Sequence, residues 1–172
     1  AARWHAAKDR DIPLFDEVHR RLVERMPDST RVSVLHNDYK LDNCQFHAGQ
    51  PDRVYSVFDW DMATLGDPLV DLGTLLNYWP GEDGLYSWDR TPHFVREPYP
   101  RRAELVARYA ERTGFDVDNI CWYEAFARWK TAVVVQQIFI RYERGQTQDE
   151  RFAGYGAFAD PLIGSASVLL DR

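Results

Sequence analysis

Two short stretches decide how this sequence is interpreted: HNDYKLDN at residues 36–43 and VFDWD at residues 57–61. The first places Asp38 and Asn43 on one loop, and the second ends a β-branched and aromatic run with Asp59. Strand ends that bring oxygen-bearing side chains together are usual sites for hard cations and phosphates. Asn43 and Asp59 would supply the oxygen ligands that Mg²⁺ prefers, which leaves Asp38 to accept a proton from an attacking hydroxyl.

The composition is that of a globular chain with an acidic surface. In 172 residues, 21 Lys and Arg stand against 27 Asp and Glu, so the formal net charge is −6, and 45% of the residues are hydrophobic. An acidic surface repels phosphate backbones, so nucleic acid is not expected as a partner. The sequence has no apolar run near the roughly 18 residues of a membrane span and no signal-peptide core at its start. We therefore expect a cytoplasmic protein without a membrane segment.

Apolar periodicity and turn residues predict a mostly helical α+β fold with a small β-unit early in the chain. Residues 79–100 contain four prolines and two glycines and are expected to form a long irregular excursion. Its aromatic side chains would either line an acceptor pocket or pack the loop. The expected helices are 11–26, 69–78, 101–112, 121 to about 143 and one within 160–170, and the expected strands are 31–35, 44–47 and 54–58.

The pattern H-x-D-x-x-x-x-N, followed by a strand and an aspartate, resembles the catalytic and metal-binding loops of the protein-kinase-like phosphotransferases. With VFDWDMATLGDPLVDLG at residues 57–73, the string is similar to the aminoglycoside phosphotransferase and choline kinase branch. Within that branch it is most similar to the kinase domains allied with acyl-CoA dehydrogenases. The resemblance is close over residues 34–77. It implies that residues 1–172 form a C-terminal lobe, with a catalytic segment at about 31–78 and a helical remainder at 79–172.

The family's functional residues carry over one by one. The resemblance implies that Asp38 is the catalytic base and that Asn43 and Asp59 hold Mg²⁺ and the nucleotide. It places Lys40 near the transferring phosphate and gives His36 the task of bracing the loop through hydrogen bonds. The predicted catalytic group is therefore Asp38 with Lys40 and His36.

Two neighbouring positions complete the loop. Asp71, in the G-D-P-x-x-D string, is expected to cap a helix and to accept backbone N–H groups of the catalytic loop. Asn37 stands where the family usually has glycine after the histidine, which restricts the backbone there. Asparagine tolerates a positive φ better than most residues, so the loop can still form.

Other residues receive simpler interpretations. Cys44 and Cys121 form no C-x-x-C pair and are expected to be separate thiols, the first of them buried and inert. Gln136, Gln137 and Arg141 on the long helix are expected at the surface rather than on substrate. The string GYGAFA (154–159) matches a dinucleotide-binding pattern, but a polar segment precedes it where a strand would be needed. We therefore reject a dinucleotide site there.

A kinase of this class also needs a small N-terminal lobe with a phosphate-covering loop and a strand lysine. Only one predicted helix precedes His36, so the N-terminal nucleotide lobe is absent from this chain. The chain is then a fragment of a longer parent protein, or a full protein whose small lobe has been lost. Its expected protein partner is the missing N-terminal lobe or a dimer partner. Because positioning and electrostatics are nearly all of phosphoryl-transfer catalysis, we expect the isolated chain to be weak or inactive.

The predicted function is transfer of the γ-phosphate of ATP or GTP to a hydroxyl of a small molecule, with Mg²⁺ as cofactor. The acceptor stays open between an aminoglycoside-like compound and a hydroxyacyl-CoA-like metabolite. The alternative is a non-catalytic, pseudokinase-like module that binds a nucleotide or a partner. The intact Asp38, Asn43 and Asp59 argue against that module, whereas the absent lobe argues for it. A helical interaction domain would leave these three residues unexplained.

Overall fold

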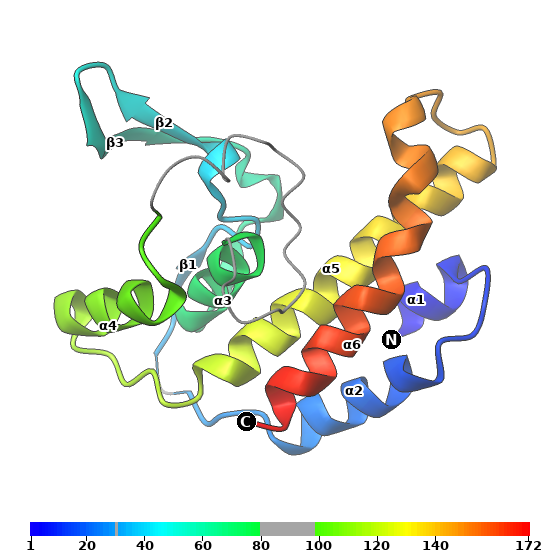
Figure 1. Ribbon diagram of the computed structural model, residues 1–172, viewed down its shortest axis with the longest axis horizontal. Helices are drawn as coiled ribbons and strands as arrows, with labels where there is room; N and C mark the ends of the chain where they lie inside the picture. Colours follow the sequence, from blue (N-terminus) through cyan, green and yellow to red (C-terminus); the bar gives the residue numbers. More distant parts are fainter. Residues whose placement is uncertain (30, 80–98) are drawn as a thin grey trace.

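The fold is built around one long helix, α5 (Ile120–Glu143), as a computed structural model describing residues 1–29, 31–79 and 99–172 shows (Figure 1). Helix α6 (Ala159–Leu170) runs back alongside α5, and α3 (Leu69–Tyr78) packs against α5 as well. The other elements are α1 (Ala2–Ala7), α2 (Pro13–Glu24), β1 (Ser33–Leu35), η1 (Leu41–Asn43), β2 (Cys44–His47), β3 (Gln50–Val57), η2 (Trp60–Met62), β4 (Thr64–Gly66), α4 (Arg102–Thr113) and η4 (Glu150–Phe158).

The predicted helices are present, and the mostly helical α+β fold class is confirmed. Pro13 stands at the start of α2, where its missing N–H costs nothing. Gly114 ends α4 with φ of 68°, and its N–H donates to the Ala110 carbonyl at 2.8 Å. Among the described elements, α1, β4 and the short 3-10 helices η1, η2 and η4 were not predicted. The β4 strand was missed because a three-residue strand shows no periodicity of its own.

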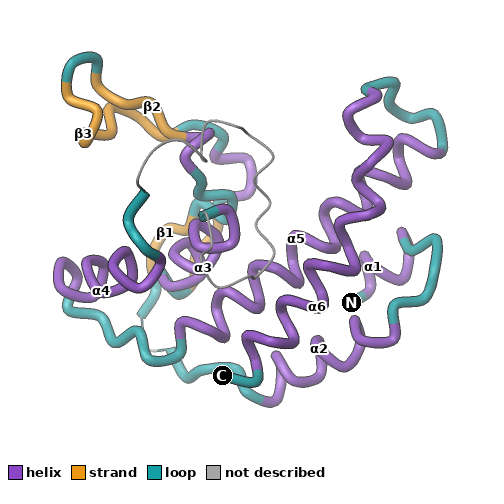
Figure 2. Tube along the Cα trace, viewed as in Figure 1, coloured by secondary structure: helices purple, strands orange, loops and turns teal. Residues whose placement is uncertain are grey.

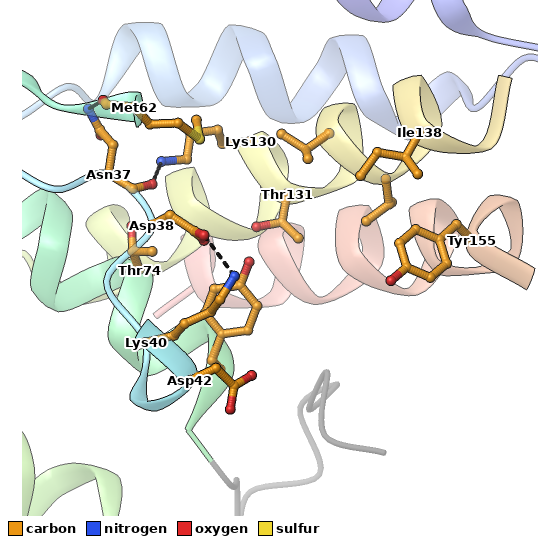
Figure 3. A pocket seen from close by; sticks show the side chains of 13 residues that line it. Asn37, Asp38, Lys40, Asp42, Met62, Thr74, Lys130, Thr131, Ile138 and Tyr155 are labelled. Carbon is orange, nitrogen blue, oxygen red and sulfur yellow. Dashed lines mark hydrogen bonds and ion pairs between the residues drawn. The ribbon is translucent and has the colours of Figure 1, made fainter. Parts of the chain in front are cut away.

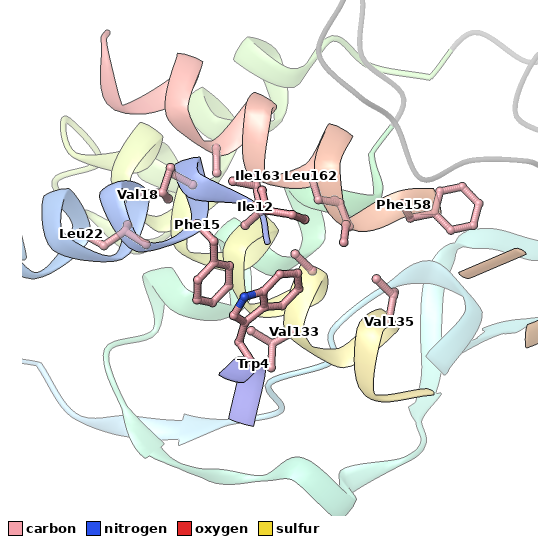
Figure 4. Close-up of a cluster of buried hydrophobic side chains, with 14 of the residues drawn as sticks. Trp4, Ile12, Phe15, Val18, Leu22, Val133, Val135, Phe158, Leu162 and Ile163 are labelled. Carbon is pink, nitrogen blue, oxygen red and sulfur yellow. The ribbon is translucent and has the colours of Figure 1, made fainter. Parts of the chain in front are cut away.

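The main hydrophobic core lies between α1, α2, α5 and α6 (Figure 4). Trp4 of α1 stacks on Phe15 of α2 with ring centroids 4.4 Å apart, and Phe15 also stacks on Trp129 at 5.1 Å. Leu162 and Ile163 of α6 complete the buried cluster, and both are 0% exposed. Burial of these side chains is what holds the four helices together.

A second, smaller core joins α3 to α5 and brings the site to the helical body. Its buried members are Leu69, Leu72, Leu76 and Tyr123. At Gly73 a Cβ atom would lie 2.6 Å from the carbonyl of Tyr123, so the two helices meet backbone to backbone. Because only glycine permits this approach, Gly73 determines how closely α3 can carry its side chains to α5.

In the described part of the chain, the strands form two separate two-stranded antiparallel sheets, β1 with β4 and β2 with β3. Figure 2 shows them gathered on the side of α3 that faces away from α1, α2 and α6. In the second sheet Cys44 pairs with Val57, and Phe58 N–H donates to the carbonyl of Asn43 at 2.8 Å. This register places Asn43, the end of the first motif, beside the residues that lead into Asp59.

One predicted surface residue of α5 proves to be buried. Gln136 is 0% exposed, and its side-chain amide donates to the Ala7 carbonyl at 3.1 Å and to Asp9 Oδ1 at 2.9 Å. The prediction was wrong because α1, which packs here on α5, was not expected. Gln137 is half-buried, whereas Arg141 is exposed as predicted. Within the described residues, no helix is long and apolar enough to cross a bilayer.

Candidate active site

The loop that carries the first motif places Asp38 on the wall of a cavity of about 260 Å³ (Figure 3). Lys40 Nζ forms an ion pair with Asp38 Oδ2 at 2.7 Å. Asn43 Nδ2 donates to the same carboxylate oxygen at 3.1 Å and to the Asp38 carbonyl at 2.8 Å. A cation and an amide therefore fix the carboxylate, while its place in the cavity wall leaves it open to a ligand.

His36 lies behind the loop and braces it. Its side chain is 2% exposed, its Nε2 lies 2.6 Å from the Phe58 carbonyl, and its Nδ1 accepts from Asp38 N–H at 3.2 Å. An Nδ1 that accepts and an Nε2 that donates describe a neutral imidazole with its proton on Nε2. The predicted bracing through hydrogen bonds is confirmed, and His36 ties the loop to the residue that precedes Asp59.

Asp71 of α3 anchors the first two residues of the loop. Its Oδ2 accepts from His36 N–H and its Oδ1 from Asn37 N–H, both at 2.7 Å. The prediction that Asp71 accepts backbone N–H groups of the catalytic loop is therefore confirmed. The predicted helix-capping role is wrong, because Asp71 lies inside the first turn of α3 and Asp67 accepts from the Leu69 N–H instead. Asn37 has φ of 63°, so it occupies the left-handed region that glycine usually fills.

Asn43 and Asp59 stand on neighbouring chain segments with oxygen atoms available. Within the described residues, the Asn43 amide oxygen and the exposed Asp59 carboxylate accept no hydrogen bond and join no ion pair. Asp59 also has a left-handed backbone, with φ of 61°. Asn37 and Asp59 are the described non-glycine residues with positive φ, and such conformations concentrate at functional sites.

A lysine from the helical body completes the site and was missed by the sequence analysis. Lys130 of α5 lines the cavity, and its Nζ donates to the Asn37 carbonyl at 2.6 Å. Burial lowers the pKa of Lys130, although Asp38 and Asp71 act to raise it. The one sequence signal for Lys130 was a charged residue inside a largely apolar helix. That signal is not specific, because Glu124 on the same helix shows it too and does not line the cavity.

Tyr78 of α3 was also missed. It lines the cavity, and Lys40 Nζ lies 5.2 Å from its ring centroid. Burial, followed by the nearby Asp38 carboxylate, raises the pKa of Tyr78 well above its ordinary value, so the phenol stays protonated. Asp38 is thus surrounded by cationic and neutral hydrogen-bonding groups from three elements.

The far end of the cavity is apolar. Val134 and Ile138 line it from the next turns of α5, and Tyr155 adds an aromatic ring from η4. Figure 3 shows Ile138 and Tyr155 farther along α5 than Lys130, away from the Asp38 end. The cavity therefore combines a charged end at the motif loop with an apolar end between α5 and η4.

The remaining sequence interpretations can be placed. Cys44 and Cys121 are free thiols, and Cys44 is half-buried rather than buried as predicted, although this burial raises the pKa of its thiol. Residues 154–159 lie in η4 and the first residue of α6, which excludes a strand-turn-helix dinucleotide site there. Trp79 is buried and its ring packs edge-on against Tyr99 at 5.6 Å. The other aromatic residues considered for an acceptor pocket, Tyr86, Trp88 and Phe94, lie outside the described residues.

Comparisons with known proteins agree with this geometry. A family model described as "Phosphotransferase enzyme family" matches residues 1–129. Acyl-CoA dehydrogenase family member 11 of Mus musculus is 32% identical over 154 residues, which cover 86% of this chain and 19% of that protein. The Homo sapiens protein of the same name is 28% identical over 180 residues, covering 99% of this chain and 22% of that protein.

A solved structure from Ralstonia eutropha, assigned to the aminoglycoside phosphotransferases, superimposes with a TM-score of 0.81 and 26% identity. The match covers 99% of this chain and 52% of that one. The chain thus spans about a fifth of the length of the family member 11 proteins and about half of the solved structure. Together, the family model, the loop geometry and the superposition establish that this chain belongs to the phosphotransferase enzyme family and has the protein-kinase-like fold of the aminoglycoside phosphotransferases.

Proposed function

We propose that this chain is the large lobe of a small-molecule kinase, which transfers the γ-phosphate of ATP or GTP to an acceptor hydroxyl. The observation that carries the proposal is Asp38, a carboxylate fixed by Lys40 and Asn43 at the charged end of a cavity. A group held within hydrogen-bond reach of a bound hydroxyl can act as general base. Residues 1–172 would form the C-terminal lobe, and the nucleotide would lie between it and an N-terminal lobe of the parent protein.

The chain's own residues divide the task. Asp38 accepts the proton of the attacking hydroxyl and orients its oxygen toward the phosphate. Lys40, which pairs with Asp38 at 2.7 Å, would stabilise the negative charge that develops on the transferring phosphate. His36 and Asp71 hold the loop so that these two groups keep their places. The isolated lobe leaves the nucleotide side open to water, so we expect it to be weak or inactive by itself.

The residues fit a magnesium ion, the cofactor that the family implies. Asn43 offers an amide oxygen and Asp59 a carboxylate, neither of which accepts a hydrogen bond within the described residues. Mg²⁺ prefers such oxygen ligands and keeps water and phosphate oxygens in its remaining positions. Asn43 and Asp59 would hold the ion, and it would supply neutralisation of phosphate charge.

The lining of the cavity bears on the acceptor. Two acidic side chains, Asp38 and Asp42, are balanced by Lys40 and Lys130, so the cavity has no surplus of carboxylates for a polycationic amino sugar. Its far end is apolar, as an acyl chain would require. The lining therefore favours a hydroxyacyl-CoA-like acceptor over an aminoglycoside-like one, in keeping with relatives named for acyl-CoA dehydrogenases.

The test uses the full-length parent protein and a panel of hydroxyacyl and aminoglycoside acceptors, with phosphate transfer from ATP and GTP as the readout. Asp38→Asn should lower kcat on the order of 100- to 10,000-fold while nucleotide affinity stays near that of the wild type. Asp59→Asn should instead weaken Mg²⁺-dependent nucleotide binding on the order of 10- to 100-fold.

Asp61→Asn is the matched control for both variants, because Asp61 is exposed and lies two residues from Asp59. It should behave like the wild type. Full turnover in Asp38→Asn would remove the base from the mechanism. Nucleotide binding without transfer to any acceptor, in the full-length wild type, would support the pseudokinase-like alternative instead.

A further inference from the structure

Asn37, the residue before Asp38, is held by three separate elements, two of which bind its backbone and one its side chain. Its N–H donates to Asp71 of α3 at 2.7 Å, and its side-chain amide donates to the Met62 carbonyl of η2 at 3.0 Å. Its carbonyl accepts from Lys130 Nζ of α5 at 2.6 Å. A non-glycine residue keeps a left-handed backbone, here with φ of 63°, only where its surroundings over-determine it. The three contacts hold Asn37 in this left-handed conformation.

Lys130 is an unexpected group at this position. Its amine is drawn away from water, and burial lowers its pKa against the opposing influence of Asp38 and Asp71. Within the described residues, its one hydrogen-bond partner is the neutral carbonyl of Asn37. An ammonium group in such a setting adds little to stability, because its desolvation opposes the gain from the hydrogen bond. Holding the loop therefore accounts for a lysine at this position better than a contribution to the stability of the core does.

The peptide between Asn37 and Asp38 is fixed at both of its polar groups. Its carbonyl accepts from Lys130, and its N–H, which belongs to Asp38, donates to His36 Nδ1 at 3.2 Å. A planar peptide that is held on both sides has one orientation, and that orientation sets the direction in which the Asp38 side chain leaves the backbone. Figure 3 shows Lys130 reaching from α5 to Asn37, with Asp38 directly beside them.

We propose that Lys130 is a positioning residue for Asp38, which acts by fixing the Asn37–Asp38 peptide against α5. The inference rests on the proposed function, since it assigns Asp38 the role of base. Helix α5 packs against α1, α2, α3 and α6, so Lys130 ties the loop to the helix around which the described chain is packed. Displacement of a reacting group by about 1 Å can lower a rate on the order of 100-fold.

The test compares substitutions of Lys130 in the full-length protein, with kcat, nucleotide KM and thermal unfolding measured for each. Lys130→Met keeps the aliphatic stem but has no donor, and it should lower kcat about 10- to 100-fold with nucleotide KM within about twofold. Lys130→Arg keeps a cationic donor and should recover most of the rate. Lys130→Gln, with a shorter neutral donor, should fall between them. Arg141→Met, an exposed substitution on the same helix, is the control and should match the wild type.

A second comparison separates this inference from the proposed function. In an Asp38→Asn background, Lys130→Met should cost no more than about a further twofold, because its effect passes through Asp38. Wild-type kcat in Lys130→Met beside an inactive Asp38→Asn would overturn the positioning role alone. A full, multiplicative loss in the double variant would also overturn it. Wild-type turnover in Asp38→Asn would overturn the proposed function itself.

Discussion

The helical half of the molecule (α1, α2, α5 and α6) and the site half (residues 31–79) are stabilised by different interactions. In the helical half, side chains such as Phe15, Val18 and Leu162 are 0% exposed and exclude water. The site half contains nine of the twelve large hydrophobic side chains that are exposed in the described part of the chain. Its loop is held by hydrogen bonds instead, with Asp71 as the chief acceptor.

The exposed apolar side chains show which face of the site half lacks a cover. Val34 of β1 is 62% exposed and Leu65 of β4 is 69% exposed. Val34 and Trp60 also line a shallow, mainly apolar cavity of about 230 Å³. The helical half therefore contributes most of the buried core, whereas the site half contributes most of the exposed apolar side chains.

The sharpest test of this contrast is a pair of truncations. Phe15→Ala should lower the free energy of unfolding by about 3–5 kcal/mol, because it opens a cavity in the main core. Val34→Ala should change it by less than about 0.5 kcal/mol in this chain, because that side chain is largely in water. Urea unfolding measures both. Similar losses in the two variants would show that the strand face is already packed and would break the comparison.

Asp71→Ala tests whether hydrogen bonds rather than burial hold the loop. It leaves the N–H groups of His36 and Asn37 without their acceptor, so we expect a loss of about 2–3 kcal/mol in unfolding free energy. The full-length protein should also lose turnover, because Asp38 follows these residues directly. Asp116→Ala is the control, since Asp116 is exposed and, within the described residues, accepts only from the nearby Asp118 N–H. Wild-type turnover together with a lowered unfolding free energy would confine Asp71 to a structural role.

The site half was predicted from sequence better than its weak packing suggests. Residues 36–43 and Asp59 form a local motif. Asp71 could be added to it because it belongs to the G-D-P-x-x-D string that follows. The structure confirms the contacts expected of His36 and Asp71. The catalytic and metal roles of the motif stay predictions, because no contact within the protein tests them.

What the sequence could not supply depends on long-range packing. Lys130 and Tyr78 enter the site only because Gly73 lets α3 lie against α5, and no local pattern reveals that approach. Gln136 was misplaced for the same reason, since its partners lie on and just after α1, more than a hundred residues away. Local motifs therefore pointed to the candidate catalytic and metal-binding residues, whereas tertiary contacts determined which other residues line the cavity.

Gly73→Ala tests the joint between the two halves. Its Cβ would meet the Tyr123 backbone at 2.6 Å, and backbone cannot yield as a flexible side chain would. We expect α3 to shift and the unfolding free energy to fall by about 1–3 kcal/mol, together with a change in the fluorescence of site-half tryptophans. Gly164→Ala is the control, because nothing lies within 4 Å of its added Cβ and alanine favours a helix. Equal behaviour of the two variants would contradict a backbone-to-backbone contact.

The smallest expected effect concerns Asp67, which ties the start of α3 to α5. Its Oδ1 accepts from Leu69 N–H at 2.8 Å and its Oδ2 from the Tyr123 hydroxyl at 2.6 Å. Burial alone would raise the pKa of this carboxyl, but these hydrogen bonds and one from Ser29 hold it below its ordinary value.

Because the pKa of Asp67 is lower in the folded than in the unfolded state, its contribution is complete above about pH 5 and is lost as the pH falls below about 4. Asp67→Asn should therefore cost about 1 kcal/mol at pH 7 and little near pH 2, as urea unfolding at both pH values would show. An equal loss of unfolding free energy at both pH values would mean that the contact of Asp67 with α5 depends on the shape of its side chain and not on its charge. A loss confined to neutral pH would make this contact a charge-assisted link, unlike the apolar packing around Gly73 beside it.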